Sequence, residues 1–516
     1  MRCLMSDTAH KAASQVDKNI RKFQPRKTSP INVLSKQETL PMIDRTQDLV
    51  RNNGVASGAL ETIVDNVVGT GLRLNATVDH VLLGISKGEA DDLGKVIEAH
   101  FRAYANSTDI DARKQWNFAT LTQLVLKTEL QSGEVFALPY WRKKGNEKFK
   151  TSFLVIEPEH VCNPNGVDNT AKLKDGVRIN EIGAPVGYYV AKRHPYENND
   201  YYSLIEGENT WQYVPLTTEF GRKRIIHYFT PNRTGGLRGK PFLSNSLKRF
   251  SMLDNYEESE LQAAVVNAMI AAIVETMSDA APEDVKEMFG SFTNYLDEQA
   301  EQDYSLNNGK VLHTLPGEKV HSFDTKRPNA QFADFVDGVL KHIAAGVNLP
   351  IELLTKDFRD SNYSSVRSAL LEAWRTFKRK RQHIATYWAN EVYALWFEEA
   401  VSSGVLPINL NDFYKNKEAY LRCEWIGPGK GWIDPVKEAQ GSKLRIESGL
   451  STYTQECAEQ GLDFNEVVEN KVREIKHMKE TAEKEGLTLG EVMPALNETL
   501  LKAEGTKDSN KKDDKE

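Results

Sequence analysis

Apolar residues recur at helical spacing near the start of the chain. The recurrence begins after Asp44 and ends at Gly69-Thr70-Gly71, where glycine is a common helix stop. Its apolar members are Leu49, Ala56, Leu60, Ile63, Val64, Val67 and Val68. A second helix is expected at 91–105, whereas residues 1–44 have little periodicity and are predicted to form a flexible arm.

The pattern changes to short β-type runs between Glu134 and Thr230. Clusters of Gly, Pro and Asn separate these runs, as in an irregular β-rich domain. The predicted strands are 135–141, 153–156, 187–193 and 224–229. Helical segments flank this region, so the fold class is predicted to be α+β.

Two helices around a small insert are expected in the next part of the chain. The first, 243–277, would be one helix of roughly 33 residues and about 50 Å at 1.5 Å per residue. Its second half is apolar nearly all round and is therefore expected to be buried on most sides, either by neighbouring elements or by neighbouring subunits. Residues 278–328 are predicted to hold a helix and two short strands, and 331–348 a helix that stops before Pro350 and pairs with the first.

A polar segment and a long amphipathic helix follow Pro350. The members of the polar segment are Lys356, Asp357, Phe358, Arg359, Asp360, Ser361 and Asn362. The apolar stripe of the helix after it consists of Leu370, Trp374, Phe377, Ile384, Trp388, Val392 and Leu395. The polar segment is either a solvent loop between two helices or, in a ring of copies, a loop that converges on the axis. Nothing in this region predicts catalysis.

Length and charge restrict the classes of function. The 516 residues favour two or more structural units, because one core rarely grows past about 250–300 residues. The formal net charge of −7 argues against tight, sequence-specific DNA binding, which needs a basic excess, but permits weak contact with DNA as it permits most other functions. Four widely separated cysteines are expected to be reduced thiols. The longest apolar run, 261–274, is too short for a membrane span.

Two segments resemble catalytic signatures. Gly84-Ile85-Ser86-Lys87-Gly88 matches the nucleophile elbow of serine hydrolases, but the strand and helix alternation of a parallel sheet is missing, so a turn near a helix start is favoured. The segment 235–240 is one residue short of a phosphate loop, and Pro241 replaces the magnesium-binding hydroxyl. A glycine-rich turn without ATP hydrolysis is expected there, and no cofactor or metal is predicted.

The long helix also carries basic residues that are candidates for contact with DNA or with a neighbouring subunit. These are Arg367, Arg375, Lys378 and Arg379. The basic run 378–381 could touch phosphates, but Trp374 and Trp388 on the same helix favour pairing with acids of a neighbouring subunit.

Three blocks of sequence resemble the lambda-type family of phage portal proteins, and the match covers roughly residues 40–470. The first block is Leu49-Val50-Arg51-Asn52-Asn53 with Asn66-Val67-Val68-Gly69-Thr70-Gly71. The second is Gly346-Val347-Asn348-Leu349-Pro350, through Asp360-Ser361-Asn362-Tyr363-Ser364-Ser365, to Arg367. The third is Gly431-Trp432-Ile433-Asp434-Pro435-Val436-Lys437-Glu438-Ala439 with Gly449-Leu450-Ser451-Thr452. The resemblance implies a non-enzymatic ring, usually dodecameric, at one capsid vertex of the virion, through which double-stranded DNA is packaged and ejected.

The resemblance also implies a division into named domains of a multidomain portal fold. The β-rich wing would comprise 45–244 together with the long helix and closing strand of 365–432. The two-helix stem would comprise 245–277 and 329–350, with the small α/β clip at 278–328 between them. The tunnel loop would be 351–364 and the α-helical crown 433–503. The arm 1–44 and a disordered tail, 504–516, fall outside the match. Expected partners are the terminase large subunit, capsid and scaffold proteins and head-completion or tail adaptor proteins, with assembly in the bacterial cytoplasm and no membrane contact. The alternatives are a serine hydrolase that uses Ser86 and a monomeric helical scaffold or adaptor.

Overall fold

The computed structural model describes residues 36–142, 145, 147–192, 194, 211–274, 310–313, 332–359, 362–431 and 434–487, with the isolated residues Lys18, Lys22 and Ser29 before them. The chain divides into two compact units. Unit 1 combines Met1–Phe242 with Ser361–Glu516, and unit 2 is Leu243–Asp360. Two units agree with the expectation from length.

Unit 1 begins with two helices that the sequence pattern had joined into one. α2 spans Lys36–Asn52 and α3 spans Gly54–Val67, and the Asn53 side chain caps α3 by accepting from the Ala56 backbone N–H at 2.9 Å. The predicted flexible arm to residue 44 is therefore wrong in its last nine residues, which are helical. Packing explains the difference, because α2 contacts α3 and α6 and buries Ile43 although Pro41 lies inside the helix.

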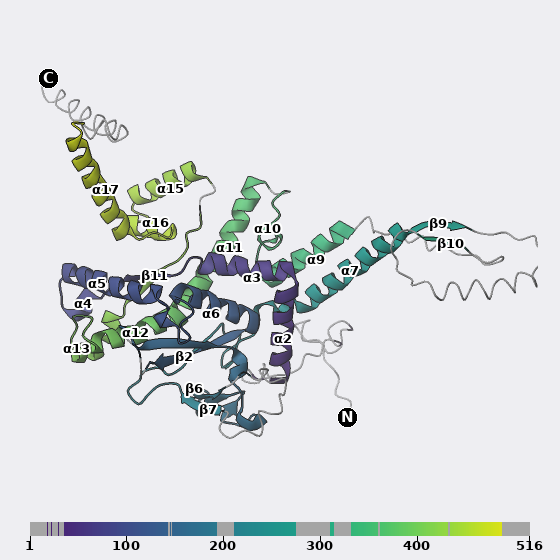
Figure 1. The fold of residues 1–516 in the computed structure, drawn as a ribbon, viewed down its shortest axis with the longest axis horizontal. Coiled ribbons are helices and arrows are strands. Elements are labelled where there is room, and N and C mark those ends of the chain that lie inside the picture. The colour runs from purple at the N-terminus through teal and green to yellow at the C-terminus, as the bar shows by residue number, and fades with distance from the viewer. Residues whose placement is uncertain are drawn as a thin grey trace, which may run out of the picture. The chain divides into compact units, whose positions relative to one another are not determined.

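Two antiparallel sheets form the β-rich part of unit 1 (Figure 1). The first has the order β3 (Thr151–Ile156), β2 (Glu134–Trp141) and β8 (Ile226–Phe229), and α6 (Phe118–Ser132) packs on β2. The second has the order β4 (Leu173–Lys174), β5 (Val177–Ile179), β6 (Pro185–Ala191) and β7 (Trp211–Pro215). All four predicted strands exist, as β2, β3, β6 and β8. They share a core that contains Phe136, Tyr188 and Ile225.

The long amphipathic helix of unit 1 runs from α11 (Tyr363–Ile384) through a π-helical turn (Ala385–Ala389) into α12 (Asn390–Ser402). Most of the predicted stripe is buried, but Leu370 and Trp374 are only half-buried. The ring of Trp396 contacts those of Phe101, Tyr104 and Phe149 from distant parts of the chain. These contacts join α12 to α5 (Lys87–Asn106), the confirmed second helix.

Further short elements complete unit 1. β1 (Arg73–Ala76) pairs antiparallel with β11 (Cys423–Ile426), the closing strand. The remaining short elements are α4 (His80–Leu83), α13 (Leu410–Lys415), α14 (Lys417–Tyr420) and the 3-10 turns Thr108–Ile110, Pro158–His160, Pro164–Gly166 and Phe242–Asn245, the last of which crosses into unit 2.

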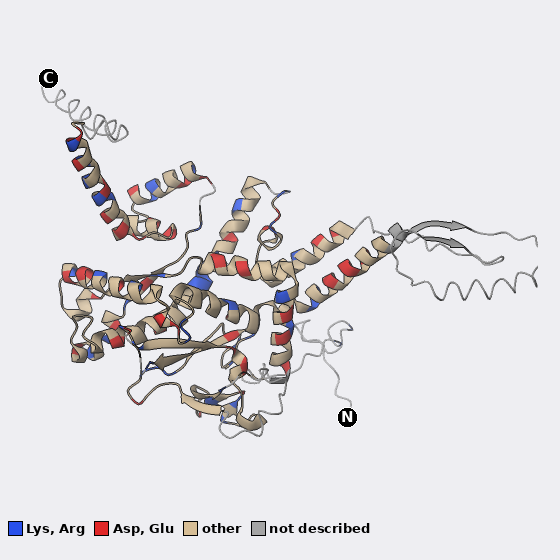
Figure 2. Cartoon of the chain, viewed as in Figure 1, with Lys and Arg blue, Asp and Glu red and all other residues tan. Residues whose placement is uncertain are grey.

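Three helices rich in charged residues follow in the C-terminal part: α15 (Pro435–Glu447), α16 (Tyr453–Glu459) and α17 (Phe464–Lys484). Acidic and basic residues mix along α17 (Figure 2). Glu466 of α17 pairs with Arg73 and, at 2.6 Å, with Arg102, and these pairs join the helix to β1 and α5.

Unit 2 is built on two helices that contact each other, α7 (Leu247–Met269) and α9 (Phe332–Gly346). The Tyr256 ring lies 5.6 Å from that of Phe332 and 4.8 Å from that of Phe335. The predicted single helix 243–277 is wrong beyond Met269, because the chain continues as strand β9 (Ile270–Val274), which pairs in parallel with β10 (Lys310–His313). The sequence of β9, with two isoleucines and a valine, suits a strand. The rest of the predicted insert lies outside the described residues.

Candidate functional site: a charged loop and the next helix in the sequence

The predicted polar loop begins where the short helix α10 (Ile351–Thr355) ends. Lys356 takes a left-handed backbone conformation with φ of 58°, which stops the helix. The Asp357 carboxylate then accepts from the Arg359 backbone N–H at 3.1 Å and from the Arg359 guanidinium at 3.0 and 2.6 Å. These bonds lower the pKa of Asp357 to about 2.

The pairing within the loop decides which of its groups are available to a ligand. Arg359 and Asp357 neutralise each other, so the exposed positive charge of the described loop belongs to Lys356. Phe358 is 44% exposed although it is a large apolar residue. Asp360 and Ser361 lie outside the described residues. Asn362 is not free to bind a ligand through its Oδ1, which accepts from the Ser365 backbone N–H at 2.9 Å and caps α11.

The basic run of α11 divides into two outward and two inward side chains. Lys378 and Arg379 are exposed and form no ion pair with a described residue, and Arg367 and Arg375 are also exposed. Arg375 pairs with Glu372 at 2.9 Å one helical turn away. The four candidate residues of the helix therefore face solvent in unit 1.

Lys380 and Arg381, in contrast, are used within the chain. The ammonium of Lys380 lies 3.9 Å from the buried Glu129 and 5.1 Å above the Phe242 ring. Arg381 donates to the carbonyl oxygens of Asn66 at 2.7 Å and Val67 at 3.1 Å, which are orphan acceptors at the end of α3. Burial lowers the pKa of Arg381 to about 10. The prediction that the run 378–381 pairs with acids of a neighbouring subunit therefore fails for Lys380 and Arg381, which contact groups of their own chain.

Ser86 is a helix cap in the structure. Its Oγ accepts from the Glu89 backbone N–H at 3.2 Å, and the Glu89 carboxylate accepts from the Ser86 backbone N–H at 2.8 Å, which completes a capping box at the start of α5. The segment before it is the short helix α4 rather than a strand. The nucleophile elbow is therefore excluded, and the interpretation as a turn near a helix start is confirmed.

The glycine-rich turn 235–240 is confirmed as a turn, and it brings Arg238 into a buried cluster that sequence reasoning missed. Arg238 Nε donates to Glu134 Oε1 at 2.6 Å, His227 Nε2 donates to Glu134 Oε2 at 2.8 Å, and the Gly239 backbone N–H donates to the same oxygen at 3.1 Å. Burial alone raises the pKa of Glu134, but Arg238 and His227 outweigh it and lower the pKa. The cluster is fully paired and structural.

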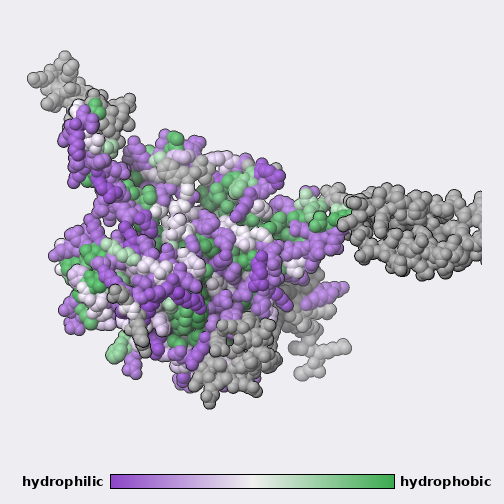
Figure 3. Space-filling view, in the orientation of Figure 1, coloured by the Kyte–Doolittle hydropathy of each residue, from purple (hydrophilic) through white to green (hydrophobic). Residues whose placement is uncertain are grey.

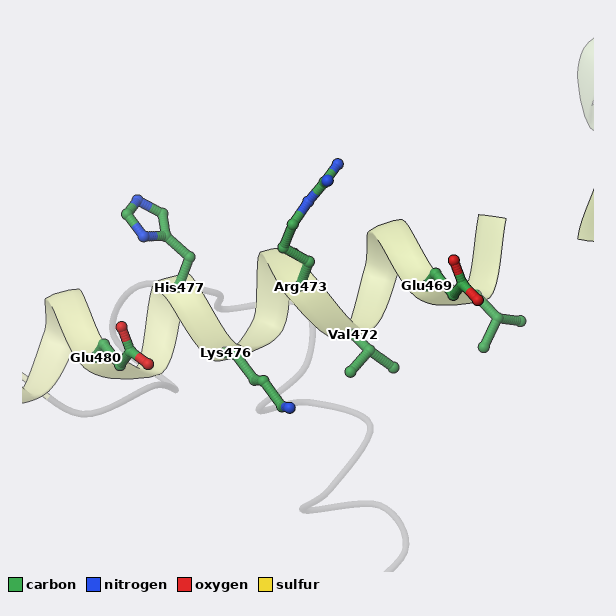
Figure 4. A pocket seen from close by; sticks show the side chains of 7 residues that line it. Glu469, Val472, Arg473, Lys476, His477 and Glu480 are labelled. Carbon is green, nitrogen blue, oxygen red and sulfur yellow. The ribbon is translucent and has the colours of Figure 1, made fainter. Parts of the chain in front are cut away.

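A shallow surface pocket lies on α17, but it has no enclosing wall. Its lining residues, shown in Figure 4, are Val468, Glu469, Val472, Arg473, Lys476, His477 and Glu480. All of them come from one helix, over which the surface is mostly hydrophilic (Figure 3). A small-molecule site needs a concave wall from several elements, so this surface does not suggest catalysis. No helix in the described parts of the chain is long and apolar enough to cross a membrane.

Chains of solved structures align with this one at low identity. A chain of the virion of a native gene transfer agent particle is 13% identical, with a TM-score of 0.42 and coverage of 82% of this chain and 93% of that one. A chain from the neck of the native particle, computed with C12 symmetry, is 14% identical with a TM-score of 0.38 and coverage of 83% and 95%.

Sequence comparison gives the family. A family model described as phage portal protein, lambda family, matches residues 17–381. The portal protein of Escherichia phage N15 is 31% identical over 447 residues and covers 83% of both chains. Portal protein B of Escherichia phage lambda is 30% identical over 446 residues, which are 83% of this chain and 82% of that protein. The chain therefore belongs to the lambda family of phage portal proteins, which are structural and not enzymatic components of the phage head.

Proposed function

We propose that copies of this chain close into a dodecameric ring at one capsid vertex, and that double-stranded DNA passes through the ring during packaging and ejection. Membership of the portal family carries this proposal. In this proposal, the ring forms in the host cytoplasm, acts in the virion and is the head-tail connector. The proposed partners are the terminase large subunit at 278–328, capsid and scaffold proteins around the wing, and head-completion proteins after packaging.

The loop 356–362 is the proposed tunnel loop, the part of each subunit that would lie nearest to the DNA. Three features support this role. The loop joins two helices, it is exposed in the residues described, and its Arg359–Asp357 pair leaves little net charge. A weakly charged loop limits the number of phosphates that each subunit neutralises, and affinity for DNA rises steeply with that number. The loop would therefore guide the DNA without holding it.

The first experiment measures the oligomeric state of the full-length chain. Light scattering of the purified protein, followed by negative-stain imaging, should show closed annular particles. A chain that stays monomeric at high concentration and in every salt condition would contradict the ring and favour the monomeric scaffold alternative.

The second experiment tests the loop in a packaging assay. Deletion of 356–361 removes the loop but keeps Asn362, the cap of α11, so rings should form while packaging or DNA retention falls. Phe358→Ser should cause a smaller loss of the same kind. Phe220→Ser is the matched control, because Phe220 is 93% exposed in a different turn and should package normally. Normal genome filling by the deletion variant would refute the role of the loop.

A further inference from the structure

Two carboxylates and one imidazole meet at one edge of the β-rich part of unit 1. Glu157 and Glu159 follow β3, and His194 follows β6. One ligand atom from each of the three side chains lies within 4.8 Å of the other two. His194 Nε2 is 3.2 Å from Glu157 Oε2.

The backbone holds the two segments of this cluster side by side. Val161 and Val190 form an antiparallel bridge, and His160 Nδ1 lies 2.9 Å from the Ala191 carbonyl oxygen, to which it donates. The His160 ring also contacts the His194 ring edge to face, with the centroids 5.2 Å apart. Residues on both sides of the cluster are therefore fixed by contacts that do not involve the two carboxylates.

Glu159 is the buried member of the cluster, and the ion pair between His194 and Glu157 does not account for its burial. Its side chain is only 5% exposed, and one of its carboxylate oxygens, Oε2, has no hydrogen-bond partner among the described residues. The other oxygen, Oε1, accepts from Gln47 Nε2 at 3.3 Å. A buried carboxylate oxygen without a partner costs free energy unless a cation or a donor occupies the remaining position. Burial accordingly raises the pKa of Glu159 to about 7.

We infer that Glu157, Glu159 and His194 bind a divalent transition-metal ion of the Zn²⁺ class. Two ligands that are each about 2.1 Å from a tetrahedral metal lie about 3.4 Å apart, close to the 3.2 Å between His194 and Glu157. An imidazole nitrogen favours Zn²⁺ over the hard ions Mg²⁺ and Ca²⁺, and two carboxylates balance its charge. A fourth position is left for water.

The bound ion would join the end of β3 to the end of β6 and so tie the two sheets together. Gln47, which reaches Glu159 from α2 and also donates to Ser132 Oγ at 3.2 Å, would orient the buried ligand from behind. A metal that binds the folded chain and not the unfolded chain stabilises it in proportion to the logarithm of its concentration. The site is a structural one and is independent of the proposed DNA passage.

The test uses the full-length chain, stripped of metal with a chelator and then dialysed against Zn²⁺ or Mg²⁺. We expect a single Zn²⁺ per chain by mass spectrometry and a melting temperature that rises with Zn²⁺ but not with Mg²⁺. Glu159→Gln and His194→Gln should lose both effects, and Co²⁺ bound to the wild type should give a visible absorption spectrum that both variants lack. Gln47→Ala should weaken binding about 10–100-fold.

Two controls separate this site from adventitious binding. Glu181→Gln and His477→Gln change an exposed acid and an exposed imidazole elsewhere in unit 1, and both should keep wild-type binding. If Glu159→Gln does not fold, Glu157→Gln replaces it, because Glu157 is 54% exposed. The inference is overturned if the wild type binds no Zn²⁺ after dialysis, or if the ligand variants bind it as the controls do.

Discussion

The buried cluster around Glu134 should make Arg238 one of the most important residues for the stability of unit 1. Arg238→Met removes the guanidinium that donates to Glu134 at 2.6 Å, to the Val161 carbonyl at 3.0 Å and to the Asp175 carbonyl. Methionine has about the right length for the space. It leaves the Glu134 carboxylate, which has no exposed surface, with His227 as its charged partner and the Gly239 backbone N–H as a neutral donor. Breaking one partner of a buried ion pair costs about 3–5 kcal/mol.

This cost can be converted into a melting temperature. At about 2 °C per kcal/mol, the smaller value that suits a large unit, Arg238→Met should melt roughly 6–10 °C below the wild type. Circular dichroism and intrinsic tryptophan fluorescence measure the transition. Arg375→Met is the control, because Arg375 is exposed and its ion pair in the described part of the chain is with the exposed Glu372. The melting temperature of this variant should stay within about 1 °C of the wild type.

The stabilisation of unit 1 by the pairing of Glu134 should depend on pH. The folded-state pKa of Glu134 is lowered, so its pairing stabilises the unit above the usual pKa of glutamate and loses that effect as the pH falls through the lowered value. The difference between the wild type and Arg238→Met should therefore shrink in acid. Adding Glu134→Gln to Arg238→Met should recover part of the loss, because no buried charge remains. An Arg238→Met variant that melts with the wild type, or a double variant that loses the sum of both single effects, would refute this account.

Three further changes test the local structure. In a urea titration, Gly239→Ala should destabilise unit 1 by about 1–3 kcal/mol, because its Cβ would lie 1.9 Å from the Gly133 carbonyl oxygen. Gly54→Ala should be nearly neutral in the same titration, because its Cβ would meet no atom of the described residues within 4 Å. Trp388→Asp should prevent soluble expression, since Trp388 is 1% exposed and donates to Thr122 Oγ1 at 3.0 Å, while Trp388→Phe should remain soluble. Ser86→Ala should remove the cap of α5 and lower the free energy of unfolding by about 1 kcal/mol. Neither this variant nor the wild type should react with a fluorophosphonate probe. Labelling that depends on Ser86 would contradict its role as a cap.

The sequence predicted the elements whose pattern is local. The helix near 91–105 and the strands of the β-rich part follow from spacing and from turn residues, and the structure confirms them. The change from helix to strand at Ile270 was missed, because a short apolar run has no periodicity that separates the two. The end of the flexible arm was also misplaced, since the burial of Ile43 depends on α3 and α6.

The buried cluster could not be predicted, because its members are far apart in sequence. Glu134 and Arg238 are separated by 104 positions, and neither lies in a motif that marks a buried ion pair. The glycines around Arg238 predicted a turn, but they did not indicate that Arg238 pairs with Glu134. The end of α10 before the polar segment agrees with the polar composition from Lys356 onward, but the internal Arg359–Asp357 pair depends on backbone geometry after Lys356.

The basic run of α11 shows why counts of charged residues overstate the contact with DNA. Four consecutive cations turn through about 300° of helix, so they cannot all face one surface. Two of them, Lys380 and Arg381, support Glu129 and the end of α3, and in the loop Arg359 is neutralised by Asp357. Each phosphate contact that is removed lowers the salt dependence of binding by about 0.9 in the logarithmic slope. In the proposed ring, every subunit would contribute its contacts to the same DNA, so a small number in each subunit is what allows the DNA to move.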